Sequence, residues 1–376
     1  MTILCWSKTP EDEAIKQAEN IEKHPCLVGN VCMMADCHSG YGMPIGGVVA
    51  LDNAVCPNMV GVDIGCGMLA VQTSLVNISQ EDLLAIHKGI TDSIPVGFTH
   101  HQNAQENELF NDNRWEETII CKQEKESAKH QIGTLGGGNH FIEIQKGNDC
   151  HIWFMIHSGS RNLGKKVADY YNKIAEELCT KFRQNECVKN ELAFLPRGTQ
   201  EFEDYWQEMS LCLDFAYQNR QMMSNAIKQE FLKVIPSCEF IQEINIHHNY
   251  ASIERHYSRN VIVHRKGATL ARENTIGIIP GSQGTSSYIV QGLGNEKSLC
   301  SCSHGAGRRM SRKKAKENLS IEHEQEIMGN IIHNIVSQDQ LDEAPSAYKD
   351  IDTVMEEQKD LVKILVQLKP LAVVKG

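Results

Sequence analysis

Short apolar runs broken by glycine, proline and Asp-Asn dominate the first third of the chain. Residues 46–75, GGVVALDNAVCPNMVGVDIGCGMLAVQTSL, predict short buried strands joined by turns. The polar residues from about Thr99 to Lys129 predict a surface loop and then the start of a helix. Residues 131–145 predict a glycine turn that enters a strand, and residues 151–178 predict a strand, a turn and a helix.

The second half of the chain predicts a long helix, several strands and a charged helical end. Residues 239–248, 260–268 and 275–290 have the β-branched, apolar character of strands, and the chain then finishes as LKPLAVVKG. In the long helix, apolar residues recur mostly at three- and four-residue steps, which indicates a face that packs on the core. These residues are Phe202, Tyr205, Met209, Leu213, Ala216, Met223, Ile227 and Phe231.

Composition narrows the class of protein. Forty-one per cent of the 376 residues are hydrophobic, which favours a globular chain, and the net charge of −11 argues against a general wrapper of nucleic acid. A local basic groove remains open. The 14 cysteines form no CxxC pair, and we find neither a signal peptide nor an apolar run long enough to span a membrane. We therefore expect mostly free thiols, a cytoplasmic location and no membrane partner.

Four short segments each combine a glycine turn or strand end with a transition-metal ligand. Cysteine, histidine and aspartate together suit a borderline-soft divalent ion, and a thiolate can bridge two ions. A lone buried histidine or cysteine is usually structural, but four such segments together favour a metal site. The candidates are Asp63 and Cys66, then Asn139, His140 and Glu143, then His157, and then His248 with Asn249.

The neighbouring histidines His247 and His248 cannot both be ligands of one site. Adjacent side chains of an extended strand point in opposite directions. The pattern alone does not decide which of the two faces the site.

Two segments could contact phosphate. PGSQGTSS, residues 280–287, is a loop of glycines and hydroxyls between apolar strands, although composition alone favours an ordinary turn over a ligand loop. After His304, the segment GAGRRMSRKKAKE predicts a helix with Arg308, Arg312 and Lys316 on one face. Such a face is usually just solvated, but beside a nucleophilic histidine it would make a phosphate-transfer site. Arg161, Arg265 and Lys266 could extend a basic surface.

Taken together, these segments resemble the RtcB family of RNA-splicing ligases. DIGCG, GTLGGGNHFIE, HSGSR, HHNYA, VHRKGA, IPGSQGTSSY and HGAGRRMSR occur in the order typical of that family, from residue 36 to the end of the chain. The resemblance implies an α/β (α+β) fold over residues 1–376, a compact single catalytic domain with central β-sheets, flanking helices and a buried binuclear metal site. It implies a GTP-dependent ligase that joins an RNA 3′-phosphate or 2′,3′-cyclic phosphate end to a 5′-hydroxyl end through a histidine–GMP intermediate, in RNA repair or splicing.

The resemblance also implies roles for individual residues. Cys66 would bridge two manganese ions, with His157 and His248 completing one site and Asp63 and His140 the other, while His304 would accept GMP. RNA phosphates would meet Arg161, Lys266, Arg308 and Arg312. The residues implied to hold GTP are Asn139, His140, Phe141, Ile142, Glu143, His248, Asn249, Pro280, Gly281, Ser282, Gln283, Ser287, His304, Gly305, Ala306, Gly307 and Lys375.

Two other functions fit parts of the same pattern. One is a manganese-dependent RNA end phosphatase or cyclic phosphodiesterase without ligation, which would need neither His304 as a GMP acceptor nor Lys375 in a guanine pocket. The other is a non-catalytic RNA-binding relative, which the full set of ligands disfavours. Because Lys375 lies in the last residues, a role in the site requires an ordered tail. Cys37, Ser39 and the short chain depart from the family pattern and leave the natural RNA and any activating protein partner open.

Overall fold

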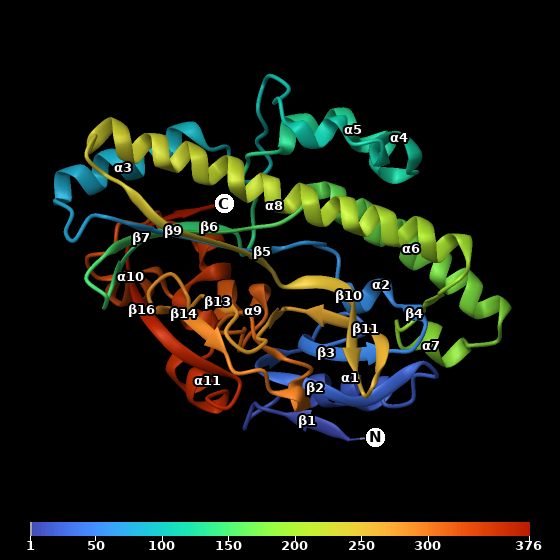
Figure 1. Ribbon diagram of the computed structural model, residues 1–376. Helices are drawn as coiled ribbons and strands as arrows, with labels where there is room; N and C mark the ends of the chain where they lie inside the picture. Colours follow the sequence, from blue (N-terminus) through green and yellow to red (C-terminus); the bar gives the residue numbers. More distant parts are fainter. Residues whose placement is uncertain (1) are drawn as a thin grey trace.

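A seven-stranded antiparallel sheet forms the centre of the computed structural model, which describes residues 2–376 (Figure 1). The last strand of the chain, β16, lies inside this sheet, between β14 and β6. In spatial order the strands are β13 (Ile276–Ile279), β14 (Ser287–Gly292), β16 (Val362–Lys375), β6 (Phe141–Gly147), β7 (Ile152–Ser158), β5 (Gly67–Thr73) and β9 (Phe240–His247).

A second, five-stranded sheet lies below the first in Figure 1. Only its β1–β2 pair is parallel. In spatial order it contains β1 (Ile3–Cys5), β2 (Leu27–His38), β3 (Ile45–Leu51), β11 (Arg259–Lys266) and β10 (Asn249–His256). Two-stranded ladders join β12 (Ala268–Leu270) to β15 (Ser301–Ser303), and β4 (Ala54–Val55) to β8 (Leu195–Pro196).

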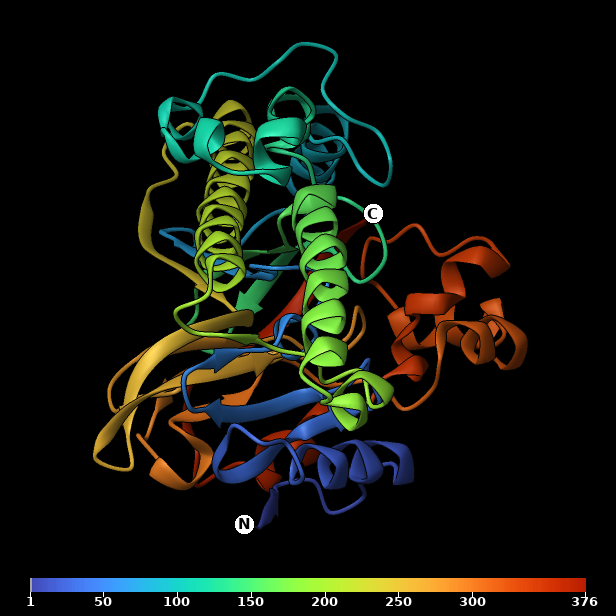
Figure 2. The same cartoon turned by 90° about the vertical axis from the view of Figure 1, so that its right-hand side faces the viewer.

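Helices cover the upper face of the seven-stranded sheet, where α3 and α8 pack on β5, β6 and β7 (Figures 1 and 2). The predicted apolar stripe is confirmed: its members on α8 are buried except Leu213, which is half-buried. Thr199 begins this helix by accepting a hydrogen bond from the backbone N–H of Phe202. The helices are α1 (Asp12–Ile21), α2 (Pro57–Val60), α3 (Gln80–Ser93), α4 (Arg114–Glu117), α5 (Ile120–Gln131), α6 (Arg161–Lys181), α7 (Asn185–Lys189), α8 (Gln200–Val234), α9 (Arg312–Asn318), α10 (Ile321–Met328) and α11 (Ile351–Glu357).

The alternation of side chains in β6 separates core from site. Ile142 and Ile144 face the helices, whereas Phe141 belongs to the cluster on the opposite face. At the end of β9 the chain passes from one sheet to the other, since β9 ends at His247 and β10 begins at Asn249. His248 therefore lies where the two sheets meet. None of the helices in residues 2–376 has the length and apolar character needed to cross a membrane.

Candidate functional site

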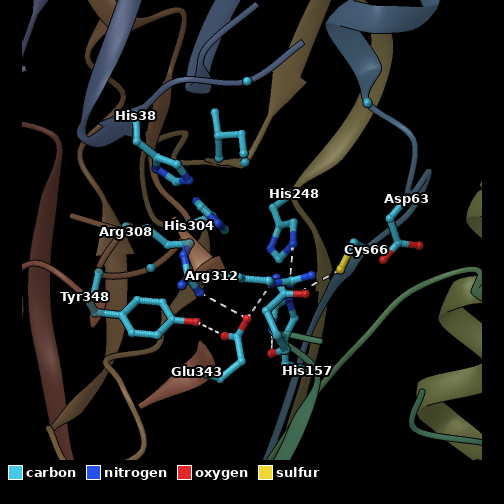
Figure 3. Close-up of a pocket in the computed structure, with 18 of the residues that line it drawn as sticks. His38, Asp63, Cys66, His157, His248, His304, Arg308, Arg312, Glu343 and Tyr348 are labelled. Atoms are coloured by element: carbon cyan, nitrogen blue, oxygen red, sulfur yellow. Dashed lines mark hydrogen bonds and ion pairs between the residues drawn. The ribbon is translucent and has the colours of Figure 1, made fainter. Parts of the chain in front are cut away.

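A cavity of about 740 Å³ opens where strands of both sheets end (Figure 3). Its wall combines segments that lie far apart in the sequence, because the ends of β2, β11 and β15 meet there with β7 and the tail of β16. The predicted site residues in this wall are Asp63, Cys66, Asn139, Phe141, His157, His248, Asn249, Lys266, Pro280, Gly281, Ser282, Gln283, His304, Gly305, Ala306, Gly307, Arg308, Arg312 and Lys375.

The five predicted metal ligands converge on one end of the cavity. Cys66 Sγ lies 3.3 Å from His157 Nε2 and 3.5 Å from His140 Nε2. His157 Nε2 is 3.4 Å from His248 Nε2, and His140 Nε2 is 3.1 Å from Asp63 Oδ2. The ligand atoms thus form two groups, Cys66–His157–His248 and Asp63–Cys66–His140, which share the thiol. This is the arrangement that the resemblance implied.

Hydrogen bonds fix the orientation of two of these imidazoles. His157 Nδ1 donates to the carbonyl of Asn139 at 3.0 Å, and His140 Nδ1 donates to the carbonyl of Leu135 at 3.0 Å. With Nδ1 as the donor, the neutral ring of His157 directs the lone pair of Nε2 at the other ligands. His248 Nδ1 is buried and has no partner among residues 2–376. Its Nε2 instead faces His157 Nε2 at 3.4 Å, and two such lone pairs repel one another unless a proton or a cation lies between them.

Burial shifts the pKa values of several side chains in this cluster. It lowers the pKa of His157 and of His248 well below the usual value, so both rings are neutral, as metal ligands must be. Burial, with nearby Asp63, raises the pKa of the Cys66 thiol. Burial opposes ionisation of Asp63, but the hydrogen bond from His140 outweighs it and keeps the pKa of that carboxyl low. The donor set therefore fits two borderline-soft divalent ions.

His304 lies next to this cluster, with its ring 4.8 Å from that of His248. On its other side, His304 Nδ1 lies 2.6 Å from Asp36 Oδ2, and the same oxygen accepts from the backbone N–H groups of His304 and Gly305. Asp36 is fully buried; burial opposes its ionisation, yet His304 keeps the pKa of its carboxyl low. The sequence analysis missed Asp36. Its only signal was an aspartate at the end of a strand, just before Cys-His-Ser-Gly.

Residues 280–283 and 305–307 also border the cavity. Ser287 lies behind this loop, where its Oγ accepts from Gly281 N–H at 3.2 Å and from Gln145 Nε2 at 3.2 Å. Glu143 is also buried; Gln145 donates to it, and burial raises the pKa of its carboxyl to about 8. Ile142 packs in the core facing α3 and α8, so its side chain is not brought to the cavity.

Glu343 pairs with three positively charged side chains at the cavity wall, and the sequence analysis did not predict it. Arg308 Nη1 and Arg312 Nε lie 3.0 and 2.9 Å from Glu343 Oε1, and Lys375 Nζ lies 3.9 Å from its Oε2. Tyr348 donates a hydrogen bond to the same carboxylate (Figure 3). The tail is therefore ordered, and Lys375 reaches the site as expected.

The predicted helix directly after His304 is wrong. The α9 helix begins only at Arg312, because Ser311 caps it by accepting from Lys314 N–H, while Arg308 forms a β-bridge with Tyr348. Arg308 and Arg312 meet at Glu343 instead of sharing a helix face.

The other predicted basic contacts point inward. Arg161 lies beside His140, with Nη1 3.3 Å from Nδ1, and donates to Thr134. Lys266 donates to the carbonyls of Tyr41 and Asn58 at the cavity wall, and burial lowers its pKa to about 8. An RNA contact for Arg161 or Lys266 stays a prediction. The proposed surface role of Arg265 is wrong, because its guanidinium is fully buried and paired with Glu254.

Sequence comparisons give a consistent family. The family model described as tRNA-splicing ligase RtcB matches residues 17–118 and 106–376. RNA-splicing ligase RtcB of Escherichia coli (strain K12) is 38% identical over 399 residues, covering 100% of this chain and 97% of that protein. The tRNA-splicing ligases RtcB of Nanoarchaeum equitans and Pyrobaculum aerophilum are each 31% identical, over 98% and 99% of this chain and 93% of each relative.

Proposed function

We propose that this chain, which belongs to the RtcB family, is an RNA ligase that uses GTP and manganese. It would join an RNA 3′-phosphate to a 5′-hydroxyl in RNA repair or splicing. The observation that carries the proposal is His304, which lies at the cavity wall between the Asp36 carboxylate and the cluster of five predicted metal ligands.

His304 would act as the nucleophile. Asp36 lies against Nδ1, so Nε2 is left to attack the α-phosphorus of GTP; the N–P bond forms as the bond to pyrophosphate breaks. An oxygen of the RNA 3′-phosphate would then attack the same phosphorus and break the N–P bond, which frees His304. The 5′-hydroxyl would finally attack the RNA phosphorus, a phosphodiester would form, and GMP would leave. A 2′,3′-cyclic phosphate would be opened by water to the 3′-phosphate first.

The cavity wall would supply groups for the nucleotide. Backbone N–H groups of glycine-rich loops suit phosphates and ring edges, and residues 280–283 and 305–307 are of that kind. Lys375 lines the same cavity and would contact the purine. Glu143, which the family resemblance assigns to the nucleotide, is buried outside this lining, and because burial raises its pKa to about 8 it would be a proton donor at neutral pH.

Asp63, Cys66, His140, His157 and His248 would hold two manganese ions. Bound there, the ions would polarise phosphate oxygens and offset the charge that develops during transfer. The neutral imidazoles of His157 and His248 need no deprotonation to bind, whereas Cys66 must release its proton.

Labelling with GTP carrying a radioactive α-phosphate tests the proposal. We expect the protein to retain label in the presence of manganese, and His304→Ala to retain none while it still binds the metal. His323→Ala is the matched control, because His323 is exposed on α10 and outside the cavity wall. Label on the alanine variant at position 304 would refute the assignment. Hydrolysis of RNA ends without any label would instead support a phosphatase or cyclic phosphodiesterase.

A further inference from the structure

Two neighbouring residues of α8, Asn219 and Arg220, lie fully buried beneath the metal-ligand cluster. Every hydrogen bond of their side chains runs to segments that carry the predicted ligands or to the strand that leads to them. Glu208, another buried polar residue of this helix, behaves differently: it accepts from the backbone N–H groups of residues 119–121 and from Tyr171, none of which belongs to the segments that carry the predicted ligands.

Arg220 contacts the residue directly before or after each ligand of one group. Its Nη1 donates to the carbonyl of Gly65 at 3.0 Å, next to Cys66, and to the carbonyl of Ser158 at 2.9 Å, next to His157. Its Nη2 lies 3.2 Å from Nδ1 of His247, next to His248. One planar guanidinium thus contacts a direct sequence neighbour of each of Cys66, His157 and His248.

Asn219 holds the segments of the other group. Its Oδ1 accepts from the N–H groups of Gly133 and Thr134 at 2.7 and 3.1 Å, directly before Leu135, whose carbonyl orients His140. Its Nδ2 donates at 3.1 Å to the carbonyl of Gly159, which packs so closely on Asp63 that a Cβ there would lie 2.3 Å from Oδ1. The same Nδ2 donates at 3.1 Å to the hydroxyl of Ser158, next to His157. Most contacts of Asn219 therefore fix the surroundings of Asp63 and His140, and one reaches the neighbour of His157.

The charge of Arg220 supports a role beyond packing. Moving a charged guanidinium out of water into the protein interior is energetically costly, and a carboxylate partner usually offsets that cost. Arg265, the other fully buried arginine, has such a partner in Glu254. The hydrogen-bond partners of Arg220 within residues 2–376 are all uncharged. A side chain needed only to fill space at this point of α8 could be apolar at lower cost.

We propose that Asn219 and Arg220 are the positioning residues of the metal centre. Arg220 sets the geometry of Cys66, His157 and His248, and Asn219 sets that of Asp63 and His140. Because most contacts of each residue go to one group, the two ions can be weakened unequally from a single turn of α8, although Cys66 belongs to both groups. The inference rests on the metal centre of the proposed function.

Manganese titration of the full-length protein, first stripped with a chelator, tests this inference without any measurement of ligase activity. The variants are Arg220→Lys, which keeps the charge but not the planar fork, and Asn219→Asp, which keeps the acceptor for Gly133 and Thr134 but loses both donors. Bound ions are counted from the free manganese signal in electron paramagnetic resonance. The spectrum of the bound metal distinguishes a coupled pair from a single ion. Glu208→Gln is the matched control, a buried polar residue of the same helix.

We expect the unaltered protein to bind two coupled ions. Each variant should bind one ion about 10- to 100-fold more weakly, which is the usual effect of changing a group that orients metal ligands, and should bind the other ion with a clearly smaller loss. At intermediate manganese, Arg220→Lys should give the single-ion spectrum of His157→Ala, and Asn219→Asp that of Asp63→Ala. Glu208→Gln should lower the unfolding temperature and leave both affinities unchanged.

Two ions bound with unaltered affinity in Arg220→Lys and Asn219→Asp would overturn the inference, whatever happens to their unfolding temperatures. Equal weakening of both ions in both variants would overturn the division between the two groups. Should Arg220→Lys fail to fold, Asn219→Asp alone decides, because it keeps half of the contacts. If the unaltered protein binds two ions but never retains GMP, the proposed function fails while this inference stands.

Discussion

Replacing Asp36 by asparagine removes one charge from beside His304 and little else. The amide oxygen can still accept from the backbone N–H groups of His304 and Gly305, at 3.1 and 3.3 Å in the unaltered protein. What is lost is the carboxylate 2.6 Å from His304 Nδ1. As Nε2 attacks phosphorus, the ring gains positive charge, and Asp36 is the buried anion nearest to that charge.

Two limits bound the effect on the rate of guanylylation. Hydrogen bonds to charged groups contribute about 1 to 1.5 kcal/mol more than neutral ones, which gives a slowing of roughly tenfold. A full charge pair at about 4 Å and an effective dielectric constant of about 20 contributes about 4 kcal/mol, roughly a thousandfold. We therefore expect Asp36→Asn to react between about tenfold and a thousandfold more slowly.

The assay is single-turnover transfer of labelled GMP to the protein at saturating GTP and manganese. Asp52→Asn is the control, because Asp52 is an exposed carboxylate paired with Arg259 and should leave the rate unchanged. Manganese affinity should not change in either variant, since neither residue belongs to the ligand groups. A rate for Asp36→Asn within about threefold of the unaltered protein would refute the role of this carboxylate.

Two further changes test other parts of the site. Glu143→Gln should stabilise the metal-free protein increasingly as pH rises from about 5 to 8. Burial raises the folded-state pKa of Glu143 to about 8, so the unfolded chain releases this proton at lower pH than the folded protein does. Over this range the unaltered protein therefore loses up to about 1.4 kcal/mol of folding free energy per pH unit, and the glutamine variant does not. Unfolding temperatures of both proteins across this range measure the effect, and a constant difference would contradict it. Arg312→Ala should reduce the slope of RNA affinity against salt by roughly one unit and spare guanylylation, because its side chain is 53% exposed at the cavity wall. Arg308→Ala should change that slope less, since Arg308 is held by Glu343, the carbonyl of Asp342 and the ring of Tyr348; equal slopes for the two variants would rule out this difference.

Local patterns and the resemblance predicted the elements and most of the cavity wall. The apolar residues of α8 recur with the period of a helix, and the buried strands next to Cys66 and His157 are continuous apolar runs. Both features can be predicted because they depend only on residues close together in sequence. His247 and His248 point in different directions, as expected, although His248 is the bend residue between β9 and β10: His247 meets Arg220, while His248 meets His157.

Contacts over long sequence distances could not be predicted in the same way. Asp36 and His304 lie 268 positions apart, and no spacing rule pairs them. Glu343 lies in a charged segment typical of surface, yet it is buried beneath two arginines. The pattern after His304 suggested a helix because residues 308–316 have good helix formers, but the bridge of Arg308 to Tyr348 and the cap at Ser311 delay it by a turn. A surface position is expected for Arg265 because arginines are mostly exposed, and no local pattern pairs this residue with Glu254.

The place of β16 has a consequence for the order in which the protein is built. This strand lies between β6, which also pairs with β7, and β14, which follows the 280–283 loop. A growing chain that has not yet reached residue 362 can already pair β5, β6, β7 and β9, and so bring the predicted metal ligands together, but β6 and β14 remain as open edges. Until β16 is made, these exposed edges need protection from other chains.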